Sequence, residues 1–246
     1  MSQIYRWNIV EHAAGYDAVA ERLHPYYAEI QDAILEQIAR PADAEFLLVD
    51  LGGGSGRLAE KFLTRFSRAS AVVVDQSEAF LDIARSRLSP FGPRATCQVA
   101  RLQDDWPARL PSAPAVITSM SAIHHLDAPE KLRLYQQCYD ALEPLGLLLN
   151  GDEIRAEDDA EYLAAVTAWA DHMRQLTVDE VVGPAMAPML EAWRERNVTQ
   201  FDQPRASGDD CHETIATQLG YFCDCGFRSV GVAWHKQMWA VLRGVK

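Results

Sequence analysis

The residues best suited to chemistry stand at the end of a short apolar run. Asp50 closes the run Phe46-Leu-Leu-Val and is followed by glycines at alternate positions, Gly52, Gly54 and Gly56. Glycine permits a sharp backbone turn and leaves no Cβ between the backbone and a ligand. Free N–H groups at the start of the helix that follows favour a negatively charged group. This segment therefore predicts a cofactor-binding loop.

Two kinds of cofactor are compatible with this loop. Gly54-Ser-Gly56-Arg-Leu-Ala59 matches the pattern G-x-G-x-x-A of dinucleotide sites. Asp75 lies at about the 20-residue distance at which such sites place a ribose-binding acid. An ionised carboxylate only accepts hydrogen bonds, which suits the two hydroxyls of a ribose. The loop alone thus leaves NAD open as the ligand.

Motifs elsewhere in the chain resemble those of the class I S-adenosylmethionine-dependent methyltransferases. The acid before alternate glycines resembles the first motif of this family, and the His-His-Leu of residues 124–126 resembles its segment after the fourth strand. Residues 14–17 and 25–27 resemble the N-terminal helices of family members that act on small molecules. Residues 142–146 resemble the family's turn before strand five, and residues 225–227 resemble its segment before strand six.

The resemblance implies a cofactor and the residues that bind it. The cofactor would be S-adenosylmethionine, with S-adenosylhomocysteine as the product. Asp50 would lie close to the methionine moiety, and Asp75 would accept hydrogen bonds from the ribose hydroxyls, which are strong when the acceptor is charged. The full set of expected cofactor-binding residues is Asp50, Gly52, Gly53, Gly54, Asp75, Gln76, Arg101, Leu102 and Ser119.

Three positions depart from the family pattern. Arg101 stands where an acid often binds the adenine amino group, so we expect Asp104, Asp105 or backbone N–H groups near Arg101 and Leu102 to take that role. Ala115 replaces the usual acid at the start of strand four, and Leu145 replaces a turn glycine. These departures leave open a non-catalytic S-adenosylmethionine-binding regulator, and the glycine pattern leaves open an NAD-dependent oxidoreductase.

Methyl transfer needs alignment of the nucleophile, the methyl group and the sulfur, together with exclusion of water. An oxygen or nitrogen nucleophile can also need a base, most often His, Glu or Asp. His124 and His125 follow the fourth expected strand and are our catalytic candidates, with packing at a helix start as the alternative. Asp152 and Glu153 are acidic candidates, with a solvated loop as the alternative.

Short apolar runs alternate with helical patterns, which is typical of a parallel sheet covered on both faces. We predict an α/β, Rossmann-like, doubly wound seven-stranded sheet with an antiparallel last strand, preceded by N-terminal helices within residues 8–40. The expected strands are 46–50, 71–75, 96–100, 115–119, 146–150, 226–230 and 237–242, and the expected helices between them are 57–66, 77–88 and 129–142.

A helical insertion interrupts the alternation after the fifth strand. We expect helices over 158–176 and 177–196, the second opened by a capping box from Thr177 to Glu180, and a last helix over 212–225. Open α/β sheets bind ligands near the carboxyl ends of their strands, so the insertion predicts a lid; extra packing is the alternative. The expected division is 1–45 as an N-terminal helical segment, 46–154 with 207–246 as the cofactor domain, and 155–206 as the insertion.

Composition narrows the class of partner. The 246 residues carry a net charge of −12, which disfavours nucleic acid as a partner. No apolar run is long enough for a membrane span, and residues 1–7 lack the pattern of a secretory signal, so we expect a cytoplasmic protein with a small-molecule substrate. A homodimer is compatible with the sequence.

The usual spacing of a zinc site is absent from the residues that could bind one, Cys211, His212, Cys223 and Cys225. We therefore expect no metal.

Overall fold

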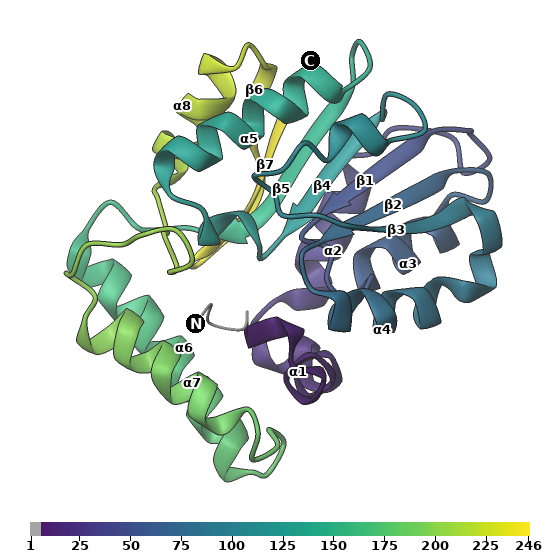
Figure 1. Cartoon of the computed structure of the whole chain (residues 1–246). Helices are drawn as coiled ribbons and strands as arrows, with labels where there is room; N and C mark the ends of the chain where they lie inside the picture. The colour runs from purple at the N-terminus through teal and green to yellow at the C-terminus, as the bar shows by residue number, and fades with distance from the viewer. Residues whose placement is uncertain (1–5) are drawn as a thin grey trace.

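The computed structural model describes residues 6–246, and seven strands in this part of the chain form one sheet in the order β3-β2-β1-β4-β5-β7-β6 (Figure 1). Within it, β7 runs antiparallel to both neighbours, and the other pairings are parallel. The strands are β1 (Leu47–Leu51), β2 (Ser70–Asp75), β3 (Ala95–Val99), β4 (Val116–Met120), β5 (Leu147–Glu153), β6 (Arg228–Lys236) and β7 (Trp239–Val245). The predicted fold class is confirmed.

Helices cover both faces of the sheet because successive strand residues point to opposite sides. One apolar cluster joins α2, α3 and α4 to residues such as Leu48 and Val73, and a second joins α5 and α8 to Val49 and Val72. The helices are α1 (Val10–Leu23), α2 (Tyr27–Glu36), α3 (Arg57–Arg65), α4 (Glu78–Leu88), α5 (Ala128–Ala141) and α8 (Ile215–Asp224). Ser77 caps α4, since its hydroxyl oxygen accepts a hydrogen bond from Phe80 N.

The insertion contains α6 (Asp159–Val178), α7 (Ala187–Arg194) and a π-helical turn over Glu195–Thr199. Figure 1 shows α6 and α7 beyond the carboxyl ends of the parallel strands, on the same side of the sheet as α1. Trp169 of α6 joins the insertion to the core, since its indole N–H donates to Leu23 O at 2.9 Å. The insertion is therefore packed against α1 as well as standing over the end of the sheet.

The predicted capping box at Thr177 is wrong. Thr177 lies in the last turn of α6, where its hydroxyl donates to Met173 O at 3.1 Å, and Glu180 follows in a turn with φ of +55°. Apolar residues such as Met173 continue the buried side of α6 to this point, so packing extends the helix past the local start motif. A hydroxyl in a helix can instead bond back to the carbonyl four residues earlier.

The C-terminal elements are longer or later than predicted. β6 continues through Trp234 and His235, which lie between the predicted strands 226–230 and 237–242, and the turn lies at Gln237 and Met238. The last helix begins at Ile215 after its N-cap Thr214 rather than at residue 212. β5 extends to Glu153 because it pairs along its whole length with β7.

Leu145 stands in the turn before β5 with φ of +64° and is 81% exposed. Left-handed backbone disfavours residues with a Cβ and suits glycine. The departure from the family pattern at Leu145 therefore leaves the turn in place, and the strand after it begins close to its predicted position.

Among the described residues, no helix is both long enough and apolar enough to cross a membrane. Residues 1–5, on which part of the expectation of no signal peptide depends, lie outside the described residues.

Candidate active site

A cavity of about 790 Å³ lies at the carboxyl ends of β1, β2, β4 and β5. The glycine loop and the residues that follow β2 and β3 line one end, and the turn after β4, the insertion and the loop before α8 line the other. Ligands of open α/β sheets bind at this edge. Of the predicted site residues, the cavity is lined by Asp50, Gly52, Gly53, Gly54, Asp75, Gln76, Arg101, Leu102, His124 and His125.

The glycine loop needs its glycines for two different reasons. Gly52 has φ of +64°, and a Cβ there would lie 2.4 Å from the Cβ of Ala122. Gly54 has φ of +52°, but a Cβ there would meet no atom within 4 Å. The first glycine allows close packing against the turn after β4, whereas the second faces open space at which a ligand can approach the backbone.

Asp75 is held rigidly at the end of β2. Its Oδ2 accepts from Gly54 N at 2.9 Å, and its Oδ1 accepts from Ser77 N at 2.8 Å. Burial raises the pKa of Asp75 above its usual value, and the hydrogen bonds from Ser77 and Gly54 oppose this effect. Each carboxylate oxygen has a second lone pair, so this side chain can still accept from a diol.

Asp50 lies at the end of β1 with an unsatisfied oxygen. Its Oδ1 accepts from the Thr118 hydroxyl at 3.0 Å, while its Oδ2 is buried with no hydrogen-bond partner among the described residues. Burial raises the pKa of Asp50 to about 7. A buried acceptor without a partner is costly, and a cationic ligand group in the adjoining cavity would satisfy it.

The loop after β3 and the end of β4 need corrections. The N–H of Arg101 donates to Asp104 Oδ2 at 2.9 Å, so it is not free for adenine, and Asp104 is occupied within its own loop. Ser119 is buried and lies outside the cavity lining, and its hydroxyl donates to Leu51 O at 2.9 Å. We therefore interpret Ser119 as a contact between neighbouring strands. Ala115 also lies outside the cavity, at the other end of β4.

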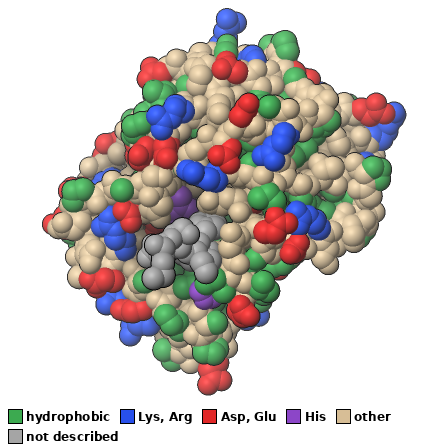
Figure 2. All heavy atoms as spheres, in the orientation of Figure 1, with side chains coloured by type: hydrophobic (Ala, Val, Ile, Leu, Met, Phe, Trp, Pro, Cys, Tyr) green, Lys and Arg blue, Asp and Glu red, His purple; other side chains and the backbone are tan. Residues whose placement is uncertain are grey.

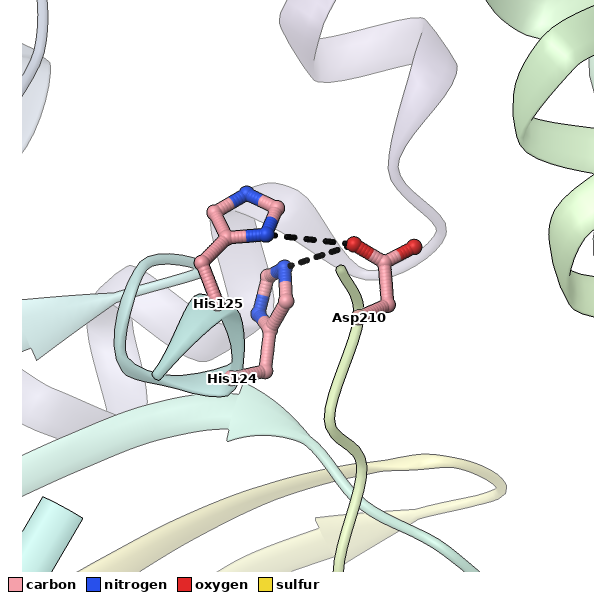
Figure 3. A group of neighbouring side chains, drawn as sticks. All are labelled: His124, His125 and Asp210. Atoms are coloured by element: carbon pink, nitrogen blue, oxygen red, sulfur yellow. Dashed lines mark ion pairs between the residues drawn. The ribbon is translucent and has the colours of Figure 1, made fainter. Parts of the chain in front are cut away.

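The short turn Ile123–His125 carries both predicted catalytic histidines, and the structure adds Asp210, which the sequence analysis did not single out (Figure 3). Two backbone hydrogen bonds hold the Asp210 loop against this turn: Gly208 N donates to His125 O at 2.8 Å, and Cys211 N donates to His124 O at 2.7 Å. Asp210 Oδ1 lies 3.2 Å from His125 Nδ1 and 3.7 Å from His124 Nε2. These contacts bring a residue from beyond the insertion to the turn after β4.

Asp152 and Glu153 are buried partners of His124, so the solvated-loop interpretation is wrong. His124 Nδ1 lies 2.6 Å from Asp152 Oδ1 and 2.8 Å from Glu153 Oε2. Burial by itself would lower the pKa of His124, but Glu153 and Asp152 raise it well above its usual value. His124 in turn holds the pKa of Glu153 well below its usual range, against the effect of burial.

His125 differs from His124 in its surroundings. Its side chain is 28% exposed, and Figure 3 shows the second ring nitrogen pointing away from Asp210. Behind the pair, burial lowers the pKa of His212 to about 3, so this histidine stays neutral and contacts the hydroxyl of Tyr162 at 2.8 Å. The ring of His125 is therefore the more accessible of the two predicted catalytic histidines.

The cysteines do not build a metal site in the described residues. Cys211 donates through its thiol to Ala206 O, and Cys223 is exposed. The clusters of possible ligands that do occur in this part of the chain consist of His, Asp and Glu.

The chain is similar in sequence and in fold to known methyltransferases. The methyltransferase domain family matches residues 48–146. The chain is 32% identical over 207 residues to trans-aconitate 2-methyltransferase of Variovorax paradoxus (strain S110), covering 78% of this chain and 74% of that protein. It is 27% identical over 142 residues to carboxy-S-adenosyl-L-methionine synthase of Aeromonas salmonicida (strain A449), covering 56% of each.

Among solved structures, an O-methyltransferase family protein from Burkholderia thailandensis has the same fold, with a TM-score of 0.65 at 17% identity over 98% of this chain and 61% of that chain. This chain thus spans little more than half of the synthase and of this structural neighbour. The chain belongs to the class I S-adenosylmethionine-dependent methyltransferases.

Proposed function

We propose that the protein transfers the methyl group of S-adenosylmethionine to a small molecule. One observation carries this proposal: a single cavity joins the glycine loop and its two acids to the His124–His125–Asp210 group. Asp75 and Gly54 lie where a ribose would bind, and the unpaired Oδ2 of Asp50 offers a site for the α-ammonium group. When bound there, the cofactor supplies a methyl group already activated by its sulfonium.

The acceptor end of the cavity favours an apolar, uncharged molecule. The insertion contributes aromatic and methionine side chains to this end: Trp169, Met173, Met186, Met189 and Trp193. The Lys and Arg side chains among the described lining residues are Arg57 and Arg101. Arg57 is engaged with Asp17 at 2.9 Å and with Glu21 at 2.7 Å. Apart from His124, whose pKa is raised, the charged side chains at this end are acids. In the metal-free protein this disfavours a polycarboxylate such as the aconitate of the relative's name.

The same charge argues against carboxymethyl chemistry on the cofactor. A cofactor with an added carboxylate would place it toward Glu153 and Asp210, which are both buried acids. Like charges in a buried site repel strongly. Nucleic acid is also a poor acceptor, since Figure 2 shows Lys and Arg interspersed with Asp and Glu on the face it draws rather than gathered into one basic surface.

The chain's own residues can move the acceptor proton and exclude water. Asp210 faces Nδ1 of His125, which leaves the second ring nitrogen to take a proton from an acceptor hydroxyl. A positioned base contributes about 10²- to 10⁴-fold. We propose that residues 155–206 act as the lid, since Trp169, Met173 and Trp193 from this segment line the cavity.

Calorimetric titration and a turnover assay test the proposal. We expect S-adenosylmethionine and S-adenosylhomocysteine to bind and NAD not to bind, and hydroxylated aromatic acceptors to yield S-adenosylhomocysteine while tricarboxylates do not. His125→Ala should lower kcat by about 10²-fold or more with an unchanged cofactor Kd. NAD binding without S-adenosylmethionine binding would refute the proposal, and cofactor binding with no turnover of any acceptor would favour the non-catalytic regulator.

Gly54→Ala is expected to separate backbone strain from ligand exclusion. The φ of Gly54 is +52° and a Cβ there meets open space, so the variant should fold with a loss of about 1–2 kcal/mol. The new methyl group would enter the cavity and weaken S-adenosylmethionine binding by about tenfold or more, since tenfold corresponds to only about 1.4 kcal/mol.

Gly92→Ala is the matched control for this prediction, because Gly92 also has positive φ, +56°, and open space around it but lies away from the cavity. Calorimetry measures the Kd of S-adenosylmethionine for both variants. Equal cofactor affinities in the two would show that the backbone at Gly54 does not approach the ligand.

A further inference from the structure

Three possible metal ligands converge at the acceptor end of the cavity. They are Nε2 of His124, Nδ1 of His125 and Oδ1 of Asp210, and all three atoms lie within 4.8 Å of one another. Figure 3 shows a nitrogen of each ring directed at the same carboxylate oxygen. Two imidazoles and one carboxylate with open positions form a ligand set used for first-row transition metals.

The contacts within this group are not those of a completed hydrogen-bond network. His125 Nδ1 is buried and forms no hydrogen bond of good geometry with a described residue, although it is ion-paired with Asp210 Oδ1 at 3.2 Å. The separation of 3.7 Å between His124 Nε2 and Asp210 Oδ1 exceeds a hydrogen bond. A buried polar atom without a hydrogen bond of good geometry requires an explanation, and an ion placed between the three atoms would supply one.

Residues behind the group orient two of the three ligands. Asp152 lies 2.6 Å from the other ring nitrogen of His124, as outer partners of metal-binding histidines commonly do. Asn197, which is 1% exposed, donates through its side-chain amide to Asp210 Oδ2 at 2.7 Å and so leaves Oδ1 toward the histidines. Metal-binding groups held in this way lose little freedom when the ion enters.

The charge around the group also suits a cation. Asp152, Glu153 and Asp210 are each at most 5% exposed, and their ion-pair partners among the described residues are histidines. Buried charges need pairing or metal coordination. A divalent ion would balance carboxylates that no described Lys or Arg contacts as an ion pair.

We propose that His124, His125 and Asp210 bind one divalent first-row transition-metal ion, with its remaining positions open to the cavity. Two imidazole donors favour Zn²⁺, Fe²⁺ or Co²⁺ over Mg²⁺ or Ca²⁺, which prefer oxygen. The inference rests on the proposed function in one respect: the ion would act as a Lewis acid that lowers the pKa of the acceptor hydroxyl, so that the proton would pass to water rather than to His125, which is the base in the metal-free protein.

Metal binding can be measured without cofactor or acceptor. Chelator-treated protein is titrated with Co²⁺, followed by visible absorption, and with Zn²⁺, followed by calorimetry. We expect one equivalent to bind, and His125→Ala and Asp210→Asn each to weaken binding by about 100-fold, since even outer-partner substitutions cost about 10- to 100-fold. His235→Ala is the matched control, because His235 is exposed and lies outside this cavity.

Three outcomes would overturn the metal site: no stoichiometric binding, equal affinities in all variants, or weakening by His235→Ala alone. Circular dichroism checks whether both site variants are folded. The partly exposed His125 gives a variant that does not depend on substituting the buried Asp210. Full turnover by chelated protein, unchanged on adding metal, would refute the Lewis-acid role while methyl transfer stands. Absence of S-adenosylmethionine binding would refute the proposed function and leave the metal titration unaffected.

Discussion

Asp50→Asn is expected to stabilise the cofactor-free protein above neutral pH while it weakens S-adenosylmethionine binding. Burial raises the pKa of Asp50 to about 7 from its ordinary value of 3.8. The unfolded chain therefore ionises this group at lower pH than the folded chain does. As pH rises from about 4 to 7, the folded state loses on the order of 4 kcal/mol of stability through this group. Asparagine does not ionise, so the variant escapes this loss.

Thermal unfolding at two pH values tests the prediction. At pH 8 the melting temperature of the variant should exceed that of the wild type by about 8–16 °C, given about 2–4 °C per kcal/mol for a chain of this size. The difference should shrink toward about pH 5, where the wild-type group is protonated in the fold. Asp105→Asn, at an exposed position outside the cavity lining, should show neither effect. A variant that is less stable than the wild type at pH 8 would contradict the proposed cost of ionising Asp50.

The same variant reports on the cofactor's ammonium group. The buried Oδ2 of Asp50 has no partner among the described residues, and hydrogen bonds to charged groups contribute about 1.5–3 kcal/mol. We expect wild-type affinity for S-adenosylmethionine to rise with pH through about 7, because the ionised carboxylate is the form that attracts the ammonium. Asp50→Asn should bind about 10- to 150-fold more weakly with little dependence on pH in this range. A wild-type Kd that is flat from pH 6 to about 8 would separate Asp50 from the methionine moiety.

Asp75→Ala is expected to weaken cofactor binding by about 1.5–3 kcal/mol. Without this carboxylate, the ribose hydroxyls would lose their hydrogen-bond acceptor. The loop would also lose the acceptor that holds Gly54 N and Ser77 N. Both losses act in the same direction, so calorimetry on the variant alone does not separate them. An unchanged Kd would remove Asp75 from the site.

A double-mutant cycle with a ribose-modified ligand separates the two effects. S-adenosylhomocysteine and its 2′-deoxy analogue are each titrated into the wild type and into Asp75→Ala. If Asp75 accepts from the hydroxyl, removal of that hydroxyl should weaken binding to the wild type and have little effect on the variant, since coupled partners are not additive. Equal losses in both proteins would mean that Asp75 acts only through the loop.

The strands, the helices between them and the glycine loop follow from local features of the sequence. The apolar runs that form β1 and β2 are buried over nearly their whole length, so continuous apolar sequence was sufficient to predict them. Positive φ at Gly52, Gly54 and Gly56 is likewise a local requirement that only glycine meets at low cost. For the same reason, the placement of Asp50 and Asp75 at strand ends was predictable.

Local features were insufficient where packing competes with them. The apolar face of α6 overrides the helix-start motif at Thr177. Glu153 is buried because β7 pairs beside it, with Trp239 opposite Glu153 although it lies 86 residues later in the chain. Asp210 illustrates the limit most clearly. The run Asp209-Asp-Cys-His212 carries chemically capable side chains, but nothing in its spacing connects it with His124.

The sequence by itself thus determined the fold class, the cofactor loop and the histidines after β4, since each depends on residues close together in the chain. Only the tertiary structure decided the partners of those histidines. Backbone hydrogen bonds from Gly208 and Cys211 bring Asp210 across the insertion to the turn that carries His124 and His125. Contacts of this kind form when the chain closes over a long loop. They produce no periodic pattern in the sequence from which they could be predicted.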